Sequence, residues 1–427
     1  MTNGEEYKER LEKEIIMNRR KLNILGLVVF LVVQLLIFMP AISKENQIDT
    51  LRVALYPYVP SRLSLFQKIE ETFEKNNPGI NLELVSDSNF LSYYYSGGLQ
   101  KVSADVYEVD TILLSDMIKL GKIAQIELPT TNFNKEAIDA VTRNGALYGV
   151  PHWLCGNFFF YKRGDKDLES ASTWLEINNI LKRRKEGLFV DFKGKSTLGE
   201  WYFTILSELE GIEKAQESIL EGNTLNPNVV SILTSMIETC PAGFCRSDDL
   251  HDRTGYYSRA FMSGKSSAYV GYSESIHYGI QYALDNCIDT SGCLSIKDIA
   301  VRRLPPSLKN SKSNGLGWVN AFAIDSKLKG EKKRLANKFI EFMVSEDTYK
   351  SILEPDWMVA PSYLIPARIN LNIDSGPLYE SFYKAHLGRQ TGTIEGLNNR
   401  LRSIGKKLDC LLPISRTDIK TRESCQP

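Results

Sequence analysis

Strand-like and helix-like segments alternate along the chain from residue 51 onward. Residues 51–60 (LRVALYPYVP) form an apolar run that ends in a proline-rich turn, which is typical of a buried strand. Residues 64–76 space their apolar side chains as a helix does, and residues 80–85 (INLELV) form a second strand-like run. Residues 104–123 follow as strand, turn and helix. This alternation predicts parallel strands joined by helical crossovers, and therefore an α/β fold.

Glycine and proline divide residues 144–162 into two short strand-like runs. We interpret this segment as a crossover between two lobes. We assign residues 48–150 and 320–400 to the first lobe and residues 151–319 to the second. Residues 401–427 are expected to form a C-terminal tail.

The N-terminal part contains an apolar segment. Residues 22–42 carry no charge, and such a run is long enough to cross a bilayer core of ~30 Å as a helix. Basic residues at 19–21 precede it, which predicts that residues 1–21 are cytoplasmic and that the bulk of the chain lies outside the cytoplasm. We therefore expect a transmembrane signal-anchor at residues 22–43. The alternative is a long signal peptide cut near residues 41–44, which would give a secreted protein.

The composition excludes several classes of function. The chain has 52 basic and 52 acidic residues, so no excess of positive charge favours nucleic acid as a partner. It has only four histidines and no dense Cys/His spacing, so we predict no metal site and no cofactor. Motifs of Ser-His-Asp hydrolases, dinucleotide-binding folds and P-loops are missing from the sequence. We expect a monomer that acts on a small molecule.

The cysteines have an informative spacing. Six of the seven lie in close pairs along the sequence: Cys240 with Cys245, Cys287 with Cys293, and Cys410 with Cys425. In an oxidising compartment such pairs are expected to form disulfides. Cys155 has no partner nearby, so it is either a buried inert thiol or a nucleophile.

The first two strands resemble a known fold. A strand and a helix followed by FEKNNPGINLELV (residues 73–85) resemble the opening of the type-2 periplasmic binding protein fold. In that fold two α/β lobes close on a ligand that is held by both lobes and the hinge. The resemblance extends from about residue 50 to about residue 370. It implies a two-lobed α/β fold with a central ligand cleft, here preceded by the N-terminal transmembrane helix.

Three stretches further resemble thiaminase I, an enzyme family on this fold. They are VALYPYVP at 53–60, GVPHWLCGNFFFYK at 149–162 and AYVGYSES at 268–275. The resemblance implies that Cys155 attacks the pyrimidine of thiamin and that Glu274 serves as the acid–base group. It also implies that the thiazole is displaced and that the pyrimidine is transferred to an amine or thiol co-substrate.

The expected cleft is aromatic, since a flat pyrimidine and a thiazolium cation both bind well to aromatic rings. In the resemblance, Tyr56 and Tyr58 match the tyrosines of the family's first strand, and Tyr272 matches the tyrosine just before the glutamate. The resemblance also implies a carboxylate that contacts the pyrimidine amino group. For that carboxylate we choose Asp105, with Asp110 as the alternative. The candidate substrate-binding residues are Tyr56, Tyr58, Tyr94, Asp105, Trp153, Tyr257, Tyr272 and Trp318. About half of these aromatic residues are expected to be ordinary core residues.

Two other functions stay open at this point. The fold equally suits a non-catalytic, membrane-tethered solute-binding protein for thiamin or a related pyrimidine. An anchored sensor is the third hypothesis, although 21 residues before the apolar run leave no room for a signalling domain. Cys155 together with Glu274 favours the enzyme, whereas a membrane tether favours a transport-linked role.

Overall fold

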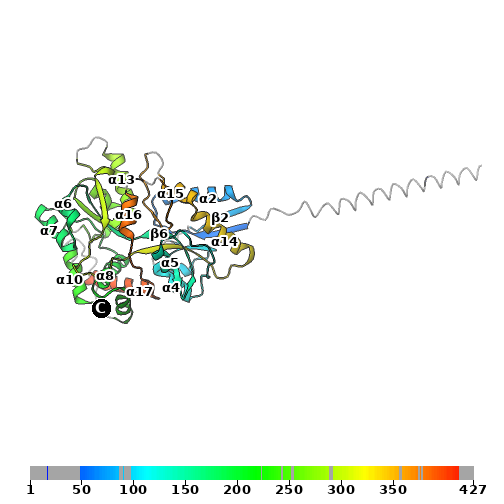
Figure 1. Cartoon of the computed structure of the whole chain (residues 1–427), viewed down its shortest axis with the longest axis horizontal. Coiled ribbons are helices and arrows are strands. Elements are labelled where there is room, and N and C mark those ends of the chain that lie inside the picture. Colours follow the sequence, from blue (N-terminus) through cyan, green and yellow to red (C-terminus); the bar gives the residue numbers. More distant parts are fainter. Residues whose placement is uncertain are drawn as a thin grey trace, which may run out of the picture. The chain divides into compact units, whose positions relative to one another are not determined.

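The structure is a computed structural model, and Figure 1 draws its helices and strands. It describes Met17 and residues 49–412 apart from residues 86–89, 91–97, 223, 242–243, 252–253, 288–291, 355–357, 374–375 and 377. The expected transmembrane segment at residues 22–43 and the candidate Tyr94 lie outside the described residues. Within the described part, no helix has the length and apolar character needed to span a membrane. Asp49, Thr50 and Asn77–Asn81 belong to a small unit of their own, and the other residues from Leu51 onward form the larger unit, which carries both lobes.

A six-stranded mixed sheet forms the centre of the first lobe, with the strand order β11-β6-β10-β3-β1-β2. Its strands are β1 (Asp49–Ala54), β2 (Ile80–Leu84), β3 (Val106–Asp110), β6 (Val150–Cys155), β10 (Trp318–Ile324) and β11 (Ile365–Pro366). β1 and β3 are parallel, as predicted, but β10 runs antiparallel to β3 and to β6. The carboxyl ends of β3 and β6 therefore lie at the same edge of the sheet as the first residue of β10.

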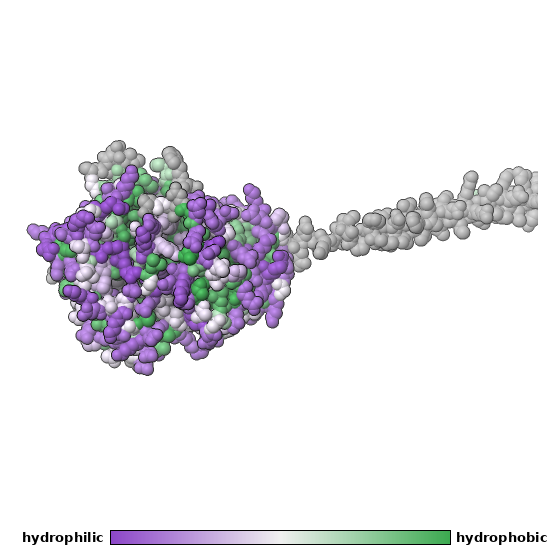
Figure 2. Space-filling view, in the orientation of Figure 1, coloured by the Kyte–Doolittle hydropathy of each residue, from purple (hydrophilic) through white to green (hydrophobic). Residues whose placement is uncertain are grey.

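Helices bury the apolar side chains of this sheet. The helices of the first lobe are α2 (Arg62–Asn76), α4 (Thr111–Lys119), α5 (Lys135–Val141), α14 (Gly330–Met343) and α15 (Glu346–Leu353). Phe66, Ile69 and Phe73 of α2 are buried, whereas Leu65 is partly exposed. Phe73 meets Phe339 of α14 edge to face at 5.2 Å between ring centroids. Apolar residues on the visible face are scattered among hydrophilic ones, as Figure 2 shows.

The second lobe is built on a three-stranded antiparallel sheet with the order β8-β7-β9. Its strands are β7 (Asn157–Lys162), β8 (Ala268–Tyr272) and β9 (Ile299–Arg303). Its helices include α6 (Lys166–Ser170), α7 (Trp174–Arg184), α8 (Lys195–Glu210), α9 (Ile212–Glu221), α10 (Pro227–Ile237), α11 (Asp248–His251), α12 (Tyr256–Met262) and α13 (Ser275–Asn286). The chain passes from one sheet to the other at Gly156 and returns between β9 and β10, so the two-lobed α/β prediction is confirmed.

The C-terminal segment contacts both lobes: its helices pack against the second lobe, and residues 393 and 396 bond to Ser115 and Asp116 of α4 in the first. The helices concerned are α16 (Tyr379–His386) and α17 (Leu397–Leu411). Phe382 of α16 contacts Phe158 of β7 edge to face, with ring centroids 5.0 Å apart. α17 lies against α8 because Gly199 leaves room for a backbone carbonyl: a Cβ there would be 2.2 Å from the Leu401 oxygen. The expected tail from residue 401 therefore begins as a packed helix.

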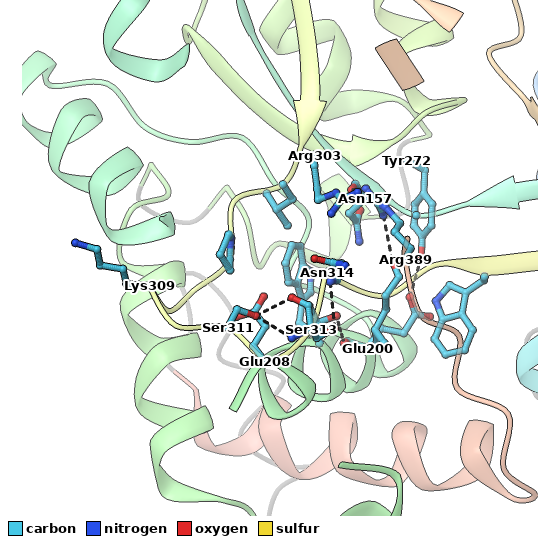
Figure 3. A pocket seen from close by; sticks show the side chains of 18 residues that line it. Asn157, Glu200, Glu208, Tyr272, Arg303, Lys309, Ser311, Ser313, Asn314 and Arg389 are labelled. Carbon is cyan, nitrogen blue, oxygen red and sulfur yellow. Dashed lines mark hydrogen bonds between the residues drawn. The ribbon is translucent and has the colours of Figure 1, made fainter. Parts of the chain in front are cut away.

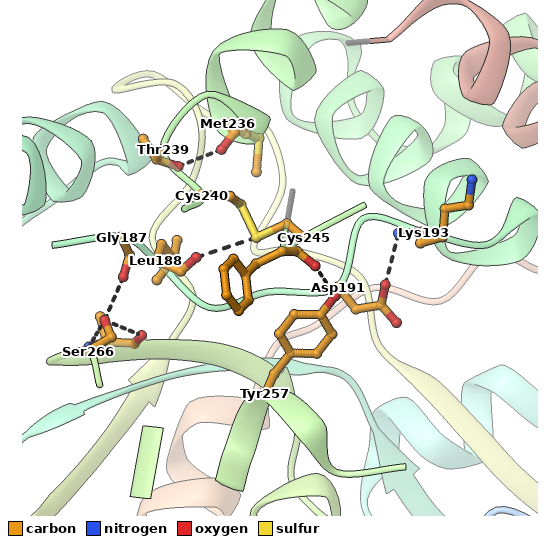
Figure 4. The surroundings of a disulfide bond; sticks show 12 residues. Gly187, Leu188, Asp191, Lys193, Met236, Thr239, Cys240, Cys245, Tyr257 and Ser266 are labelled. Carbon is orange, nitrogen blue, oxygen red and sulfur yellow. Dashed lines mark hydrogen bonds between the residues drawn. A yellow bond between two sulfur atoms is a disulfide. The ribbon is translucent and has the colours of Figure 1, made fainter. Parts of the chain in front are cut away.

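The disulfides agree with the predicted pairing in the described part of the chain. Cys240 is bonded to Cys245 and Cys287 to Cys293, with Cα–Cα distances of 5.9 and 6.0 Å. Figure 4 shows the first of these bonds beside Leu188 and Tyr257. Cys410 is also disulfide-bonded, whereas its predicted partner Cys425 lies outside the described residues. Cys155 is free and buried.

Candidate active site

One edge of the six-stranded sheet brings a thiol, an amide and a carboxyl group together. Cys155 ends β6 and lies opposite Trp318, the first residue of β10. Two residues further along β10, Asn320 lies opposite Asp110, the last residue of β3. The Nδ2 group of Asn320 donates to Sγ of Cys155 at 3.5 Å. The edge where parallel strands end is the usual position of ligand sites in α/β folds.

The second lobe adds two further carboxyl groups. Tyr272 ends β8 opposite Asn157, and Glu274 follows it directly before α13. The Oη group of Tyr272 donates to Oε2 of Glu200 on α8 at 2.7 Å. Ser273 donates to Oε2 of Glu274 at 3.3 Å. Glu274 and Glu200 both act electrostatically on the Cys155 thiol, so the groups of the second lobe and of the sheet edge form one site.

The site is buried and acidic. Burial raises the pKa of Glu274, Glu200 and Asp110 to about 7 in each case. Burial also raises the pKa of the Cys155 thiol well above its usual range, and the neighbouring carboxyl groups, Glu274 first, add to this effect. At neutral pH the thiol is therefore protonated, while the carboxyl groups are close to half-ionised. A cation placed here would favour the ionised forms of all these groups.

Aromatic side chains follow β1 in the first lobe and surround Glu200 in the second. Tyr56 and Tyr58 follow β1, pack against the core of the first lobe and meet edge to face at 5.3 Å. In the second lobe, a cavity of about 170 Å³ is lined by tyrosines and by Glu200. Its tyrosines are Tyr256, Tyr257, Tyr269 and Tyr272. These rings suit a flat or cationic ligand.

Trp153 and His152 have structural surroundings. The ring of Trp153 is buried and packs edge to face on Tyr349 at 5.2 Å. Nδ1 of His152 lies 2.6 Å from Oε1 of Glu108. Glu108 in turn accepts the backbone N–H of Tyr56 at 2.7 Å. Trp153 therefore behaves as one of the core aromatic residues that we expected among the candidates.

Asp105 is not brought to the site. It precedes β3, whereas Asp110 ends this strand, so the two carboxyl groups lie at opposite edges of the sheet. Asp105 accepts the backbone N–H of Arg52 at 2.9 Å and forms an ion pair with Lys332 at 3.0 Å. Of our two choices for the pyrimidine carboxylate, only Asp110 therefore lies at the sheet edge that carries Cys155.

Two residues of the site were not predicted from the sequence. Glu200 lies in the middle of α8, where nothing in the local pattern separates it from an exposed helical glutamate. Asn320 is the one polar residue in the strand sequence WVNAFAI, in which every residue is buried. A lone amide within a buried strand needs hydrogen-bond partners, and that pattern was a usable signal.

The C-terminal segment contacts the lobe crossing beside Cys155. Nε2 of His386 lies 3.2 Å from the carbonyl oxygen of Cys155. The guanidinium of Arg389 donates to the carbonyls of Asn157 at 2.6 Å and of Leu316 at 3.0 Å. Burial lowers the pKa of His386 to about 3, so its ring is neutral. These contacts link both lobe crossings to His386 and Arg389 and hold the backbone that carries the thiol.

A comparison with curated proteins identifies a relative. The chain is 26% identical over 364 residues to thiaminase-1 of Paenibacillus thiaminolyticus, and the match covers 80% of this chain and 83% of that protein. No family model matches the chain.

Solved structures show the same fold. Thiaminase I from Bacillus thiaminolyticus matches with a TM-score of 0.70 at 22% identity, covering 84% of this chain and 98% of that one. Clostridium botulinum thiaminase I in complex with thiamin gives 0.68 at 22% identity, with coverages of 84% and 99%. Maltose-bound MalE3 of T. maritima gives 0.61 at 16% identity, with coverages of 87% and 97%. The chain is therefore a homologue of thiaminase-1, built on a two-lobed periplasmic-binding-protein-like fold.

Proposed function

We propose that this protein cleaves thiamin and transfers its pyrimidine to an amine or thiol. One observation carries the proposal: a buried free thiol, Cys155, lies among carboxyl groups from both lobes, and Glu274 has the largest influence among them. The relative at 26% identity bears the name thiaminase-1, which supports thiamin as the substrate. A binding protein needs no thiol at this position.

The first half-reaction begins with proton transfer. Glu274, as a carboxylate, takes the proton of the Cys155 thiol, and the sulfur adds to the pyrimidine ring. The new C–S bond pushes an electron pair through the ring toward the methylene carbon. The bond between this carbon and the thiazolium nitrogen breaks, and the thiazole leaves neutral with that electron pair. Glu274 then releases its proton to water.

The second half-reaction restores the enzyme. The nitrogen or sulfur of the co-substrate adds to the methylene carbon and loses its proton to Glu274. The C–S bond to Cys155 breaks, and the departing thiolate takes the proton back from Glu274. One acid–base group thus serves both half-reactions, with the covalent intermediate between them.

The positive charge of the substrate counteracts the raised pKa of the Cys155 thiol. The thiazolium cation enters a site that several carboxyl groups make unfavourable for a thiolate. Its positive charge lowers the pKa of Glu274 and of Cys155 together, so base and nucleophile become active when substrate is bound. We assign Asp110 to the pyrimidine amino group, and Tyr56, Tyr58, Tyr257 and Tyr272 to the rings of the substrate.

Location and tethering are part of the proposal. We place the catalytic domain outside the cytoplasm, either membrane-anchored through residues 22–43 or secreted. The disulfides Cys240–Cys245 and Cys287–Cys293 support an oxidising compartment. Protease added to intact cells should digest the domain, and protection from digestion would contradict this location.

The second candidate is a non-catalytic binding protein for thiamin, which is favoured by the fold shared with maltose-bound MalE3. The test is incubation of the full chain with thiamin and aniline, followed by mass spectrometry. We expect free thiazole and an aniline–pyrimidine product, both missing with Cys155→Ser. Thiamin that binds but stays intact would support the binding protein instead.

A further inference from the structure

A second, larger cavity adjoins the nucleophile. It has a volume of about 320 Å³ and is lined by Gly156, which follows Cys155, and by Trp318, which lies opposite Cys155 in the sheet. Glu200 and Tyr272 line both this cavity and the smaller tyrosine-lined one. Their side chains, which are hydrogen-bonded to each other, therefore lie between the two spaces. Figure 3 labels both residues at the larger cavity.

Acidic groups line one part of the large cavity. Glu200 and Glu208 are two helical turns apart on α8, so both side chains project from the same face of the helix. Burial raises the pKa of each to about 7. Glu208 accepts the backbone N–H of Ser307 at 2.8 Å. The ion pairs found among the described residues include neither glutamate.

Guanidinium groups line another part of the same cavity. Arg303 and Arg389 lie together near Asn157 in Figure 3. Both donate to backbone carbonyls, and the ion pairs of the described residues include neither of them. Burial lowers the pKa of Arg389 to about 9, and the nearby Arg303 adds to this effect.

The acidic and basic groups do not neutralise each other. Neither glutamate is among the groups that shift the pKa of Arg303 or Arg389. Glu208 and Arg389 are buried, and Glu200 and Arg303 are partly buried. Keeping such opposite charges in one cavity without pairing them costs free energy, which a ligand with both charges would offset. The volume is ample for a molecule of amino-acid size.

We propose that this cavity binds the co-substrate and that the co-substrate is a small zwitterion, an amine that also carries a carboxylate or sulfonate. Its amino group lies at Glu200 and Tyr272, beside the nucleophile, and its acid group lies at Arg303 and Arg389. This inference rests on the proposed transfer reaction, because it assigns the second substrate of that reaction.

Glu200 then has a chemical role of its own. An alkyl amine is protonated at neutral pH and cannot attack in that form. Glu200 as a carboxylate takes one ammonium proton and leaves the nitrogen lone pair free to form the C–N bond. The second proton follows the route through Glu274 to the departing Cys155 thiolate. Glu200 later loses its proton to water, so the groups return to their starting states.

Matched acceptors test the proposal on the unmodified full chain. β-Alanine and propylamine are amines of similar size, and only the first carries a carboxylate. We expect a KM for β-alanine at least tenfold lower, because only its carboxylate can accept charge-assisted hydrogen bonds from the two guanidinium groups. Equal KM values for the two amines would overturn the inference. Turnover with aniline in the same assay would show that the proposed function itself still stands.

A variant and a binding measurement complete the test. Arg303→Gln should raise the ratio of KM for β-alanine to KM for aniline at least tenfold. Arg303→Lys keeps the positive charge and should raise this ratio less. Calorimetric titration of Cys155→Ser with β-alanine should show binding. The double variant Cys155→Ser, Arg303→Gln should bind β-alanine at least tenfold more weakly. Absence of β-alanine binding to Cys155→Ser would overturn the inference even if no acceptor were turned over.

Discussion

The side-chain amide of Asn320 donates to the sulfur of Cys155 at 3.5 Å, and both residues are buried in neighbouring strands. Burial and the neighbouring carboxyl groups both raise the pKa of the Cys155 thiol, and both therefore disfavour the thiolate. The Asn320 amide acts in the opposite direction, because an N–H donor stabilises a negatively charged sulfur. It is therefore expected to be a positioning residue for the nucleophile.

Asn320→Ala should slow the reaction of Cys155 with iodoacetamide by about tenfold or more. A hydrogen bond to a charged acceptor contributes about 1.5–3 kcal/mol, and its loss raises the thiol pKa further. The rate of alkylation as a function of pH measures both effects. The control is Asn178→Ala, which removes a different buried asparagine, one that lies on α7 of the second lobe. Equal alkylation rates in Asn320→Ala and the unmodified protein would contradict this role.

Glu274→Gln should reduce kcat by roughly 10²–10⁴-fold, the usual cost of losing an acid–base group. The carboxylate is the active form, and its pKa is raised to about 7 by burial. In the unmodified protein kcat/KM should therefore fall as the pH drops below about 7 and level off above it. This acid limb should be missing in the variant. If kcat/KM of the variant still falls below about pH 7, a group other than Glu274 causes that fall.

Several of these features were accessible from the sequence. The strand and helix pattern gave the α/β class, and the odd cysteine drew attention to Cys155 without any structure. Asp105 and Asp110 could not be separated, because only the strand direction decides which end of β3 faces the cleft. Glu200 could not be found either, since its burial depends on long-range packing of α8.

Gly156→Ala should destabilise the hinge and lower turnover. A Cβ at this position would lie 2.1 Å from Nη1 of Arg389 and 3.3 Å from the Leu316 oxygen. Overpacking of this kind costs about 1–3 kcal/mol in the free energy of unfolding. Urea denaturation should show this loss, and the loss should be smaller in an Arg389→Ala background. An equal loss in both backgrounds would mean that Arg389 is not the obstructing group.

Cys240→Ser combined with Cys245→Ser should lower the free energy of unfolding by about 2 kcal/mol, because the disulfide restricts the unfolded chain. The bond also supports the tyrosine-lined cavity, which we propose as part of the thiamin site, since Tyr257 donates to the carbonyl of Phe244 inside the closed loop at 2.6 Å. We therefore expect a raised KM for thiamin with little change in kcat. A changed kcat at unaltered KM would show that the loop acts elsewhere.

Intact-mass spectrometry of the protein mixed with thiamin, with no amine or thiol added, tests the central claim most directly. The covalent intermediate then lacks an acceptor and should accumulate as a pyrimidine adduct. We predict one added pyrimidine per chain, located on Cys155 by peptide mapping, released on addition of aniline and missing in Cys155→Ser. Thiamin cleavage without any adduct, or an adduct that forms equally in Cys155→Ser, would contradict the assignment of Cys155 as the nucleophile.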